Sequence, residues 1–323
     1  MRKIFLFSFL GLLCSLSGSC QEFNELVNQS LSYFKQNEFR KFEETYPKLY
    51  LEYLKTNIPS YQEAINAANS GNIELAFSNI NELIDEDLFL DEIEHDEDFK
   101  VLHQKGAWSI LLQKIKTIKS SYNEGLRSEL KEVQNRDQGI RILYLHIEND
   151  SLKTAVHDYM KTIVDNDCSA KICPILDKYG WVGTDEIGSE ANGTLFLAVQ
   201  HVDDLKVQEK YLPMLKDAVK SGKAEGWQLA FLTDRILMNQ GRKQIYGTQK
   251  IISKDPARSY IIPLEDPNNV DELRKEVGLP PLAKDLEEEG MHWDLEEYKK
   301  NLPTIEKMYR ERYETLKNGE FKK

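Results

Sequence analysis

Residues 61–77, Tyr61-Gln-Glu-Ala-Ile-Asn-Ala-Ala-Asn-Ser-Gly-Asn-Ile-Glu-Leu-Ala-Phe77, contain the pattern that decides the fold class. Four small residues stand where two helices would touch: Ala64, Ala67, Ala68 and Ala76. The Gly71-Asn72 pair between them is typical of a turn. Apolar residues recur at spacings of three and four on both sides of that turn, which predicts a helix–turn–helix unit. We therefore expect a mainly α-helical chain around this segment.

The segment 61–77 resembles the unit of tetratricopeptide repeats. Apolar stripes with helical spacing also precede it, over residues 26–54, and follow it, over residues 99–115. In the latter stretch the inner face of a closing helix would carry Trp108, Leu111, Leu112 and Ile115. One or two units are visible and the full consensus is absent, so a plain helical bundle remains the alternative. Residues 21–120 are thus predicted to form a tetratricopeptide-like helical region.

A second helical part is expected over residues 121–290. Its predicted helices cover residues 126–137, 139–148, 151–164, 189–201, 205–220, 227–240 and 270–277. The hydrophobic period changes at residues 244–249 and 260–264, which can pair as a small β-hairpin. Residues 291–323 are predicted to hold a charged C-terminal helix that stops at Asn318-Gly319.

The first 20 residues have the three-part pattern of a secretory signal peptide. Arg2 and Lys3 are followed by an apolar run over residues 4–13 and by small polar residues over 15–19. The apolar run is shorter than the roughly 20 residues that a membrane-spanning helix needs. We therefore expect residues 1–20 to be removed and the protein to be exported to the periplasm or cell envelope.

Two outcomes of that processing are possible. Leu16-Ser-Gly-Ser-Cys20 resembles a bacterial lipoprotein box, in which Cys20 is lipidated and tethers the chain to a membrane. Ser17 stands where a large aliphatic residue is usual, so plain cleavage that leaves Gln21 first is the alternative. Contact with a membrane is expected only through a lipidated N-terminus.

The charge of the chain limits its partners. Residues 1–20 contain two of the 42 basic residues and no acidic residue, so their removal changes the net charge from −12 to −14. An acidic surface repels phosphate backbones and anionic lipid headgroups, which argues against nucleic-acid binding and a basic membrane patch. Gly-rich phosphate loops and the common hydrolase motifs are missing from the sequence, and we expect no cofactor. The predicted partner is a protein or a small polar ligand.

Two clusters contain side chains that can bind metals, but neither has the pattern of a metal site. Cys168 and Cys173 are not flanked by a second ligand pair, so a disulfide or two free thiols are favoured. An oxidising envelope permits the disulfide. The acidic run 85–98, which includes His95, does not have the calcium-loop pattern and is predicted to be a solvated loop.

Several motifs in the second part stand out together. They are Arg136-Asp-Gln-Gly-Ile-Arg141, Tyr179-Gly-Trp181, Val199-Gln-His-Val-Asp203, Thr233-Asp-Arg235 and Gly241-Arg-Lys-Gln-Ile-Tyr-Gly-Thr-Gln249. With these motifs, residues 125–285 resemble an uncharacterised bacterial family known as a domain of unknown function. Val182 departs from the pattern, because such proteins often have proline there. The resemblance implies no activity.

The chemistry of these motifs supports two interpretations. In one, they form a ligand pocket in which His201 is a general acid or base and Asp234 or Asp203 orients it. The predicted ligand-binding residues are Asp137, Gln138, Arg141, Asp203, Arg235, Gln244, Tyr246, Thr248 and Gln249. In the other interpretation, the same side chains form a buried polar network that fixes the geometry without chemistry.

Two functions follow from these interpretations. The first is a non-catalytic exported interaction or ligand-binding protein, in which the N-terminal helices bind a partner and the second part is a rigid adaptor. The second is a hydrolase or transferase with His201 at its centre.

Overall fold

The computed structural model describes residues 18–253 and 258–318, without the side chains of residues 18–20. The expected signal peptide and the lipidation of Cys20 lie outside the described residues. The chain divides into two compact units, which we call the N-terminal unit (described residues 18–203) and the C-terminal unit (204–253 and 258–318). Among the described residues, every helix is too short or too polar to cross a membrane.

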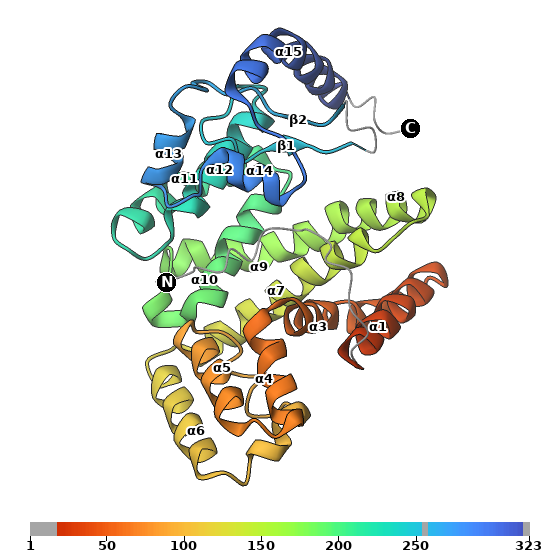
Figure 1. Ribbon diagram of the computed structural model, residues 1–323. Coiled ribbons are helices and arrows are strands. Elements are labelled where there is room, and N and C mark those ends of the chain that lie inside the picture. Colours follow the sequence, from red (N-terminus) through yellow and green to blue (C-terminus); the bar gives the residue numbers. More distant parts are fainter. Residues whose placement is uncertain (1–17, 254–257, 319–323) are drawn as a thin grey trace. The chain divides into compact units, whose positions relative to one another are not determined.

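The N-terminal unit is entirely helical in its described part (Figure 1). Its helices are α1 (Gly18–Lys35), α2 (Phe39–Thr45), α3 (Lys48–Asn57), α4 (Pro59–Ser70), α5 (Ile73–Asp85), the 3₁₀ helix η1 (Glu97–Leu102), α6 (Gly106–Lys119), α7 (Glu124–Leu145), α8 (Asp150–Tyr159), the π-helix η2 (Met160–Val164), α9 (Asp165–Tyr179) and α10 (Thr184–His201). The prediction of a mainly α-helical chain is therefore confirmed.

The helix–turn–helix unit predicted from residues 61–77 is the pair α4 and α5. Gly71 ends α4 in the left-handed conformation, with φ of +81°, which glycine adopts without steric cost. The side chain of Asn72 accepts a hydrogen bond from the backbone N–H of Leu75 and so caps α5. All four alanines are buried where the helices meet.

Helix α7 is the element on which the N-terminal unit is assembled. The two helices expected at 126–137 and 139–148 are one continuous helix, and Gly139 lies in its middle. A Cβ atom at Gly139 would lie 2.5 Å from the carbonyl oxygen of Tyr46 and 2.9 Å from Cα of Pro47. The missing side chain lets the backbones of the two segments approach. Residues on both sides of the expected boundary at 120 therefore pack into one unit.

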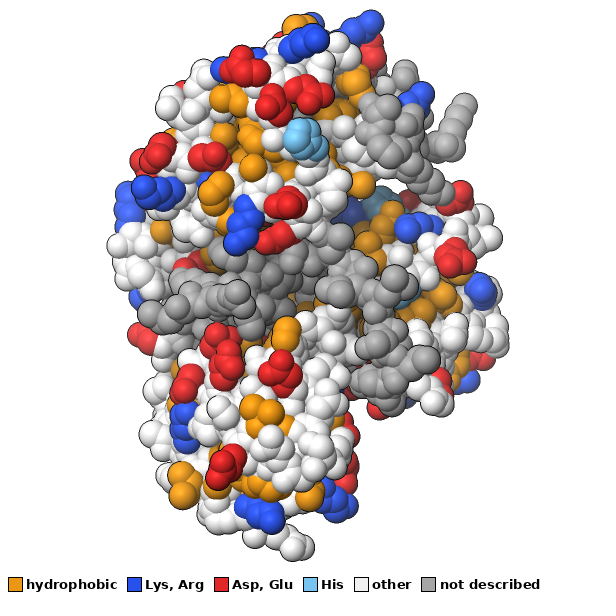
Figure 2. Space-filling model, viewed as in Figure 1, with side chains coloured by type: hydrophobic (Ala, Val, Ile, Leu, Met, Phe, Trp, Pro, Cys, Tyr) orange, Lys and Arg blue, Asp and Glu red, His pale blue; other side chains and the backbone are white. Residues whose placement is uncertain are grey.

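The acidic run 85–98 is not the solvated loop that was predicted. Four apolar residues within it are at most 6% exposed: Leu88, Phe89, Leu90 and Ile93. Their burial draws the segment into the core, and the neighbouring acidic side chains are then matched by cations on α6 and α7. On the face seen in Figure 2, acidic and basic side chains of the described residues are interspersed.

The C-terminal unit combines helices with a small hairpin. Its elements are α11 (Leu205–Lys220), α12 (Gly226–Asn239), β1 (Lys250–Ile251), β2 (Tyr260–Ile261), α13 (Val270–Glu276), α14 (Leu282–Glu288) and α15 (Leu295–Lys317). The hairpin is antiparallel and pairs Lys250 with Ile261. Residues 244–249, expected as its first strand, instead form the loop before β1. The charged helix α15 packs on this unit through Tyr298 and Tyr309.

Candidate functional site

His201, the last residue of α10, lies in a network of charged side chains within the N-terminal unit. Its Nδ1 is 3.0 Å from both carboxylate oxygens of Asp137, which α7 presents. Arg141, one turn further along α7, places Nη1 3.1 Å from Oδ1 of Asp137 and Nη2 2.6 Å from Oδ1 of Asp165. The spacing of four residues puts Asp137 and Arg141 on one helix face, as the sequence indicated. The arrangement holds the imidazole ring against a carboxylate.

Lys161 closes the other side of the network. Its Nζ is 2.7 Å from Asp165 and 2.7 Å from Asp203, and it donates a 2.8 Å hydrogen bond to the backbone carbonyl of His201. Lys161 belongs to the π-helix η2, which joins α8 to α9. Single π-helical turns are rare and occur frequently at functional sites. The turn directs Lys161 toward both the helix end and the acids around His201.

The tautomer of His201 follows from its partner. An ionised carboxylate only accepts hydrogen bonds, so Nδ1 carries the proton and Nε2 keeps its lone pair. The histidine side chain is 18% exposed, and no group among the described residues forms a hydrogen bond with Nε2. Nε2 is therefore the atom of this network that can accept a proton.

Burial and the neighbouring Arg141 favour a neutral imidazole, which can still take up one proton. Burial lowers the pKa of His201, and the nearby Arg141 lowers it further, while Asp137 opposes both effects. Burial alone would raise the pKa of Asp137, but Arg141 and His201 outweigh it and hold that pKa well below its usual range. Three carboxylates face two permanent cations, so protonation of His201 would neutralise the network.

Asp234, the other predicted catalytic residue, has a different set of partners. Its Oδ1 accepts hydrogen bonds from the backbone N–H groups of Ile245 (2.8 Å) and Tyr246 (3.1 Å). Its Oδ2 accepts from the backbone N–H and the hydroxyl of Thr248, at 3.0 and 2.9 Å. These four donors fill the lone pairs of the carboxylate. The carboxylate hydrogen-bonded to His201 is that of Asp137 and not of Asp234 or Asp203.

The loop 244–249 is held from inside by its own glutamine. The side-chain amide of Gln244 donates to the carbonyls of Gln249 and Ile262 and accepts from the N–H of Gln249, at 2.7–2.9 Å. Thr248 Oγ1 accepts a hydrogen bond from the Gln249 side chain. In this loop the side chains therefore form a buried polar network, which is the second of the two interpretations drawn from the sequence.

Arg274 completes the loop and was missed by the sequence analysis. It is fully buried, and its guanidinium donates to the carbonyls of Tyr246 (2.8 Å) and Pro280 (2.6 Å) and pairs with Asp285 at 3.1 Å. In sequence it is one charge in a charged helix, next to Lys275, and nothing there distinguishes the two.

The predicted site residues thus fall into two groups. Asp137, Gln138, Arg141, His201 and Asp203 lie in the N-terminal unit, where Gln138 donates a 2.6 Å hydrogen bond to Asp137. The C-terminal unit contains Asp234, Arg235, Gln244, Tyr246, Thr248 and Gln249, of which Arg235 and Tyr246 are half-buried. Lys161 and Asp165 were overlooked, although their spacing of four residues could have indicated a pair.

Cys168 and Cys173 both lie in α9 and form no disulfide within the described part of the chain. Cys168 and Cys173 are five residues apart on this helix, about 7.5 Å along its axis. A disulfide requires Cα atoms within about 7 Å, so the bridge does not form without unwinding the helix. Burial raises the pKa of Cys168, which makes its thiol unreactive. In the part of the chain that the structure describes, no three His, Cys, Asp or Glu side chains are placed to hold a metal ion.

Comparison with known proteins places this chain in a family. The model of a family of unknown function (DUF6624) matches residues 124–291, and the chain belongs to that family. The match confirms the resemblance seen in the motifs, and its range includes His201, Asp137 and Asp234. No curated protein and no solved structure matches the chain.

Proposed function

We propose that the protein is an enzyme of acid–base chemistry, a hydrolase or transferase, in which Nε2 of His201 is the general base. The observation that carries the proposal is the contact of His201 Nδ1 with Asp137, which leaves Nε2 with a free lone pair. Histidine oriented by a carboxylate in this way is the base of many hydrolytic sites.

The network defines what each group does in the proton transfer. Nε2 takes a proton from a water molecule or a substrate hydroxyl, and the oxygen atom attacks the substrate's electrophilic centre as that O–H bond breaks. Asp137 stabilises the imidazolium that forms and keeps the ring in place. The bond between the electrophilic centre and the leaving group then breaks as the imidazolium gives its proton to that group, which restores the neutral histidine. Arg141 and Lys161 hold the acidic side chains on which this balance depends.

The proposed place of action is the cell envelope. The pattern of residues 1–20 supports export, and Cys20 supports a lipid tether. Mass spectrometry of protein extracted from the envelope tests both: a diacylglycerol-modified Cys20 is expected, whereas an intact residue 1–20 segment would contradict export.

Activity is tested on chromogenic esters, amides and phosphoesters. The wild-type protein is expected to hydrolyse one of these classes, and His201→Gln to reduce the rate by about 10²–10⁴-fold. His157→Gln is the matched control, because His157 is half-exposed and lies in α8 outside the network. If wild type and His201→Gln hydrolyse every substrate at equal rates, His201 is not the general base.

The non-catalytic alternative has its own support in the structure. In the C-terminal unit, the carboxylate of Asp234 and the amide of Gln244 are both engaged with their own loop. If the His201 network has the same purely architectural role, His201→Gln lowers the melting temperature and the protein hydrolyses none of the substrates. Hydrolysis by the wild type that is lost in a His201→Gln variant that still folds supports the enzyme.

A further inference from the structure

A cleft in the N-terminal unit lies apart from the residues of the His201 network. It has a volume of about 750 Å³. Its lining consists of one face of α6 with the following Ser120, of Glu124 at the start of α7, and of Leu90, Asp91, Glu94 and His95. This volume is within the range of sites for small molecules. Leu90 and Ile115 are buried in its lining and Leu112 is half-buried, so the lining includes an apolar surface.

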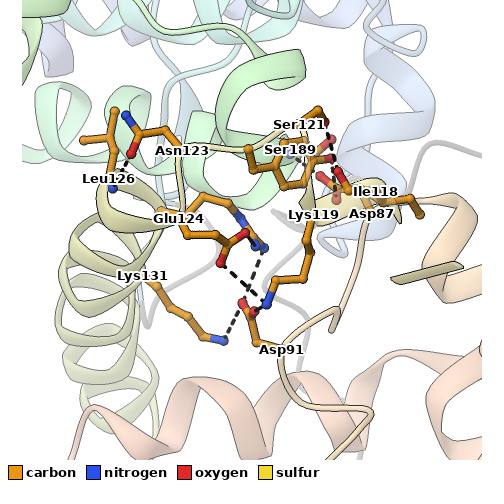
Figure 3. A network of polar contacts seen from close by, with 12 residues as sticks. Asp87, Asp91, Ile118, Lys119, Ser121, Asn123, Glu124, Leu126, Lys131 and Ser189 are labelled. Atoms are coloured by element: carbon orange, nitrogen blue, oxygen red, sulfur yellow. Dashed lines mark hydrogen bonds and ion pairs between the residues drawn. The ribbon is translucent and has the colours of Figure 1, made fainter. Parts of the chain in front are cut away.

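One wall of the cleft is a set of ion pairs that hold one another (Figure 3). Asp91 contacts Lys119 at 2.5 Å, and Arg127 and Lys131 each at 3.3 Å. Glu124 pairs with Arg127 at 3.2 Å and with Lys119 at 3.5 Å. Each of these charges has a partner of opposite sign, so the wall is electrostatically satisfied.

The segment 87–91, which contains Asp91, is also held by contacts of Asp87. Asp87 accepts a hydrogen bond from the hydroxyl of Tyr122 at 3.0 Å and another from the backbone N–H of Ser189 at 2.5 Å (Figure 3). These contacts fix residues 87–91 to the start of α7 and to α10. The cleft is thereby pre-formed, which reduces the entropy that a ligand loses on binding.

Three other titratable side chains line the cleft and take no part in these ion pairs. Glu94 and His95 come from the segment 90–95, and Lys116 comes from α6. All three are exposed, and none has an ion-pair partner among residues 18–253 and 258–318. Gln113, on the same face of α6 as Lys116, adds an exposed amide. An acid and a base therefore remain available beside an apolar surface.

We propose that this cleft binds a small zwitterion with an aliphatic body. An ammonium group of the ligand pairs with Glu94 and a carboxylate pairs with Lys116, while the aliphatic part covers Leu112 and its buried neighbours. Three acidic residues in the lining disfavour a polyanion, and the charged side chains disfavour a plain hydrocarbon. A free aliphatic amino acid and a short apolar peptide share this chemistry. The proposal is independent of the acid–base role of His201.

The test is isothermal titration calorimetry of the protein that comprises residues 21–323. The probes are leucine, trileucine, and trileucine blocked by N-acetylation and C-amidation. Saturable binding of leucine or trileucine is expected, and the probe that binds identifies the source of the ligand. The blocked peptide lacks both charges and is expected to bind at least tenfold more weakly than trileucine, if trileucine is that probe.

Charge-removing variants tie the binding to the cleft. Glu94→Gln and Lys116→Gln are each expected to weaken binding by about fivefold, the effect of one exposed ion pair. Glu63→Gln and Lys48→Gln are matched controls, because both side chains are exposed and do not line the cleft. No binding of leucine or trileucine at millimolar concentration would overturn the proposal. So would equal binding of the blocked peptide, or full affinity in both cleft variants.

Discussion

The carboxylate of Asp137 lies 3.0 Å from Nδ1 of His201, which is 64 residues further along the chain. The contact joins the middle of α7 to the end of α10, and Arg141 shares the same carboxylate. It orients the histidine for acid–base chemistry and also neutralises part of a buried ion network. Both roles lead to measurable consequences.

Removal of the Asp137 charge is expected to destabilise the fold strongly. Asp137 is 1% exposed, so Asp137→Asn leaves the charge of Arg141 with one buried partner fewer. Breaking a buried ion pair in this way costs about 3–5 kcal/mol. Urea denaturation at pH 7 measures the loss. Asp203→Asn is the control, because the Asp203 side chain is 69% exposed, and its loss is expected to stay below about 1 kcal/mol.

The stability should depend on pH through His201. Its pKa in the folded protein is lower than the roughly 6.5 of a free histidine, so the unfolded chain takes up the proton first. The stabilisation is therefore fully present above about pH 6.5 and is lost as the pH falls from that value through the lower pKa of the folded state. The difference in unfolding free energy between wild type and His201→Gln should shrink from pH 8 to pH 5.5. A constant difference would show that the pKa of His201 does not change on folding.

Glu190 should produce the opposite pH dependence. Burial, with the negative charge of Glu92 as a second cause, raises the pKa of Glu190 to about 8. Because this folded-state pKa lies above the unfolded one, the stabilisation exists at low pH and is lost as the pH rises through about 8. Glu190→Gln mimics the neutral acid, so it should stabilise the protein at pH 9 relative to wild type. At pH 4, where Glu190 is largely protonated in both the folded and the unfolded chain, the two proteins should differ little. Melting curves at both pH values decide, and a variant less stable at pH 9 would contradict the raised pKa.

A pair of glycine substitutions tests the packing of α7. Gly139→Ala brings a Cβ atom to 2.5 Å from the backbone oxygen of Tyr46, so a loss of about 1–3 kcal/mol is expected. Gly193 lies in α10, where a Cβ atom would meet nothing within 4 Å. Gly193→Ala should therefore stabilise the helix by up to about 1 kcal/mol. Chemical denaturation of both variants measures the contrast, and equal effects would show that the close approach at Gly139 is not needed.

Much of the fold could be predicted because its determinants are local. The alanines and Gly71 are enough for the α4–α5 pair, and helical periodicity located most other helices. The acidic run was misread because charges dominate its composition, while burial depends on the few apolar residues between them, such as Phe89 and Ile93. Gly139 looked like a helix boundary, whereas its role is a contact with a segment that is distant in sequence.

The candidate site could be predicted only in part. His201, Asp137 and Arg141 were singled out by type and motif, but the pairing of His201 with Asp137 depends on how α7 and α10 pack. Asp234 was expected to orient His201 because carboxylates often do so. Its actual partners are mostly backbone N–H groups of the loop 244–249, and these carry no sequence signature.

The central claim is that Nε2 of His201 is a free base, and ¹⁵N NMR of the imidazole nitrogens tests it most directly. The signals of His201 are assigned by their disappearance in His201→Gln. At pH 7, Nδ1 is predicted to carry the proton and Nε2 to be unprotonated, with a titration midpoint below about 6.5. A proton on Nε2 in the neutral ring, or an imidazolium that persists above pH 7, would contradict the claim.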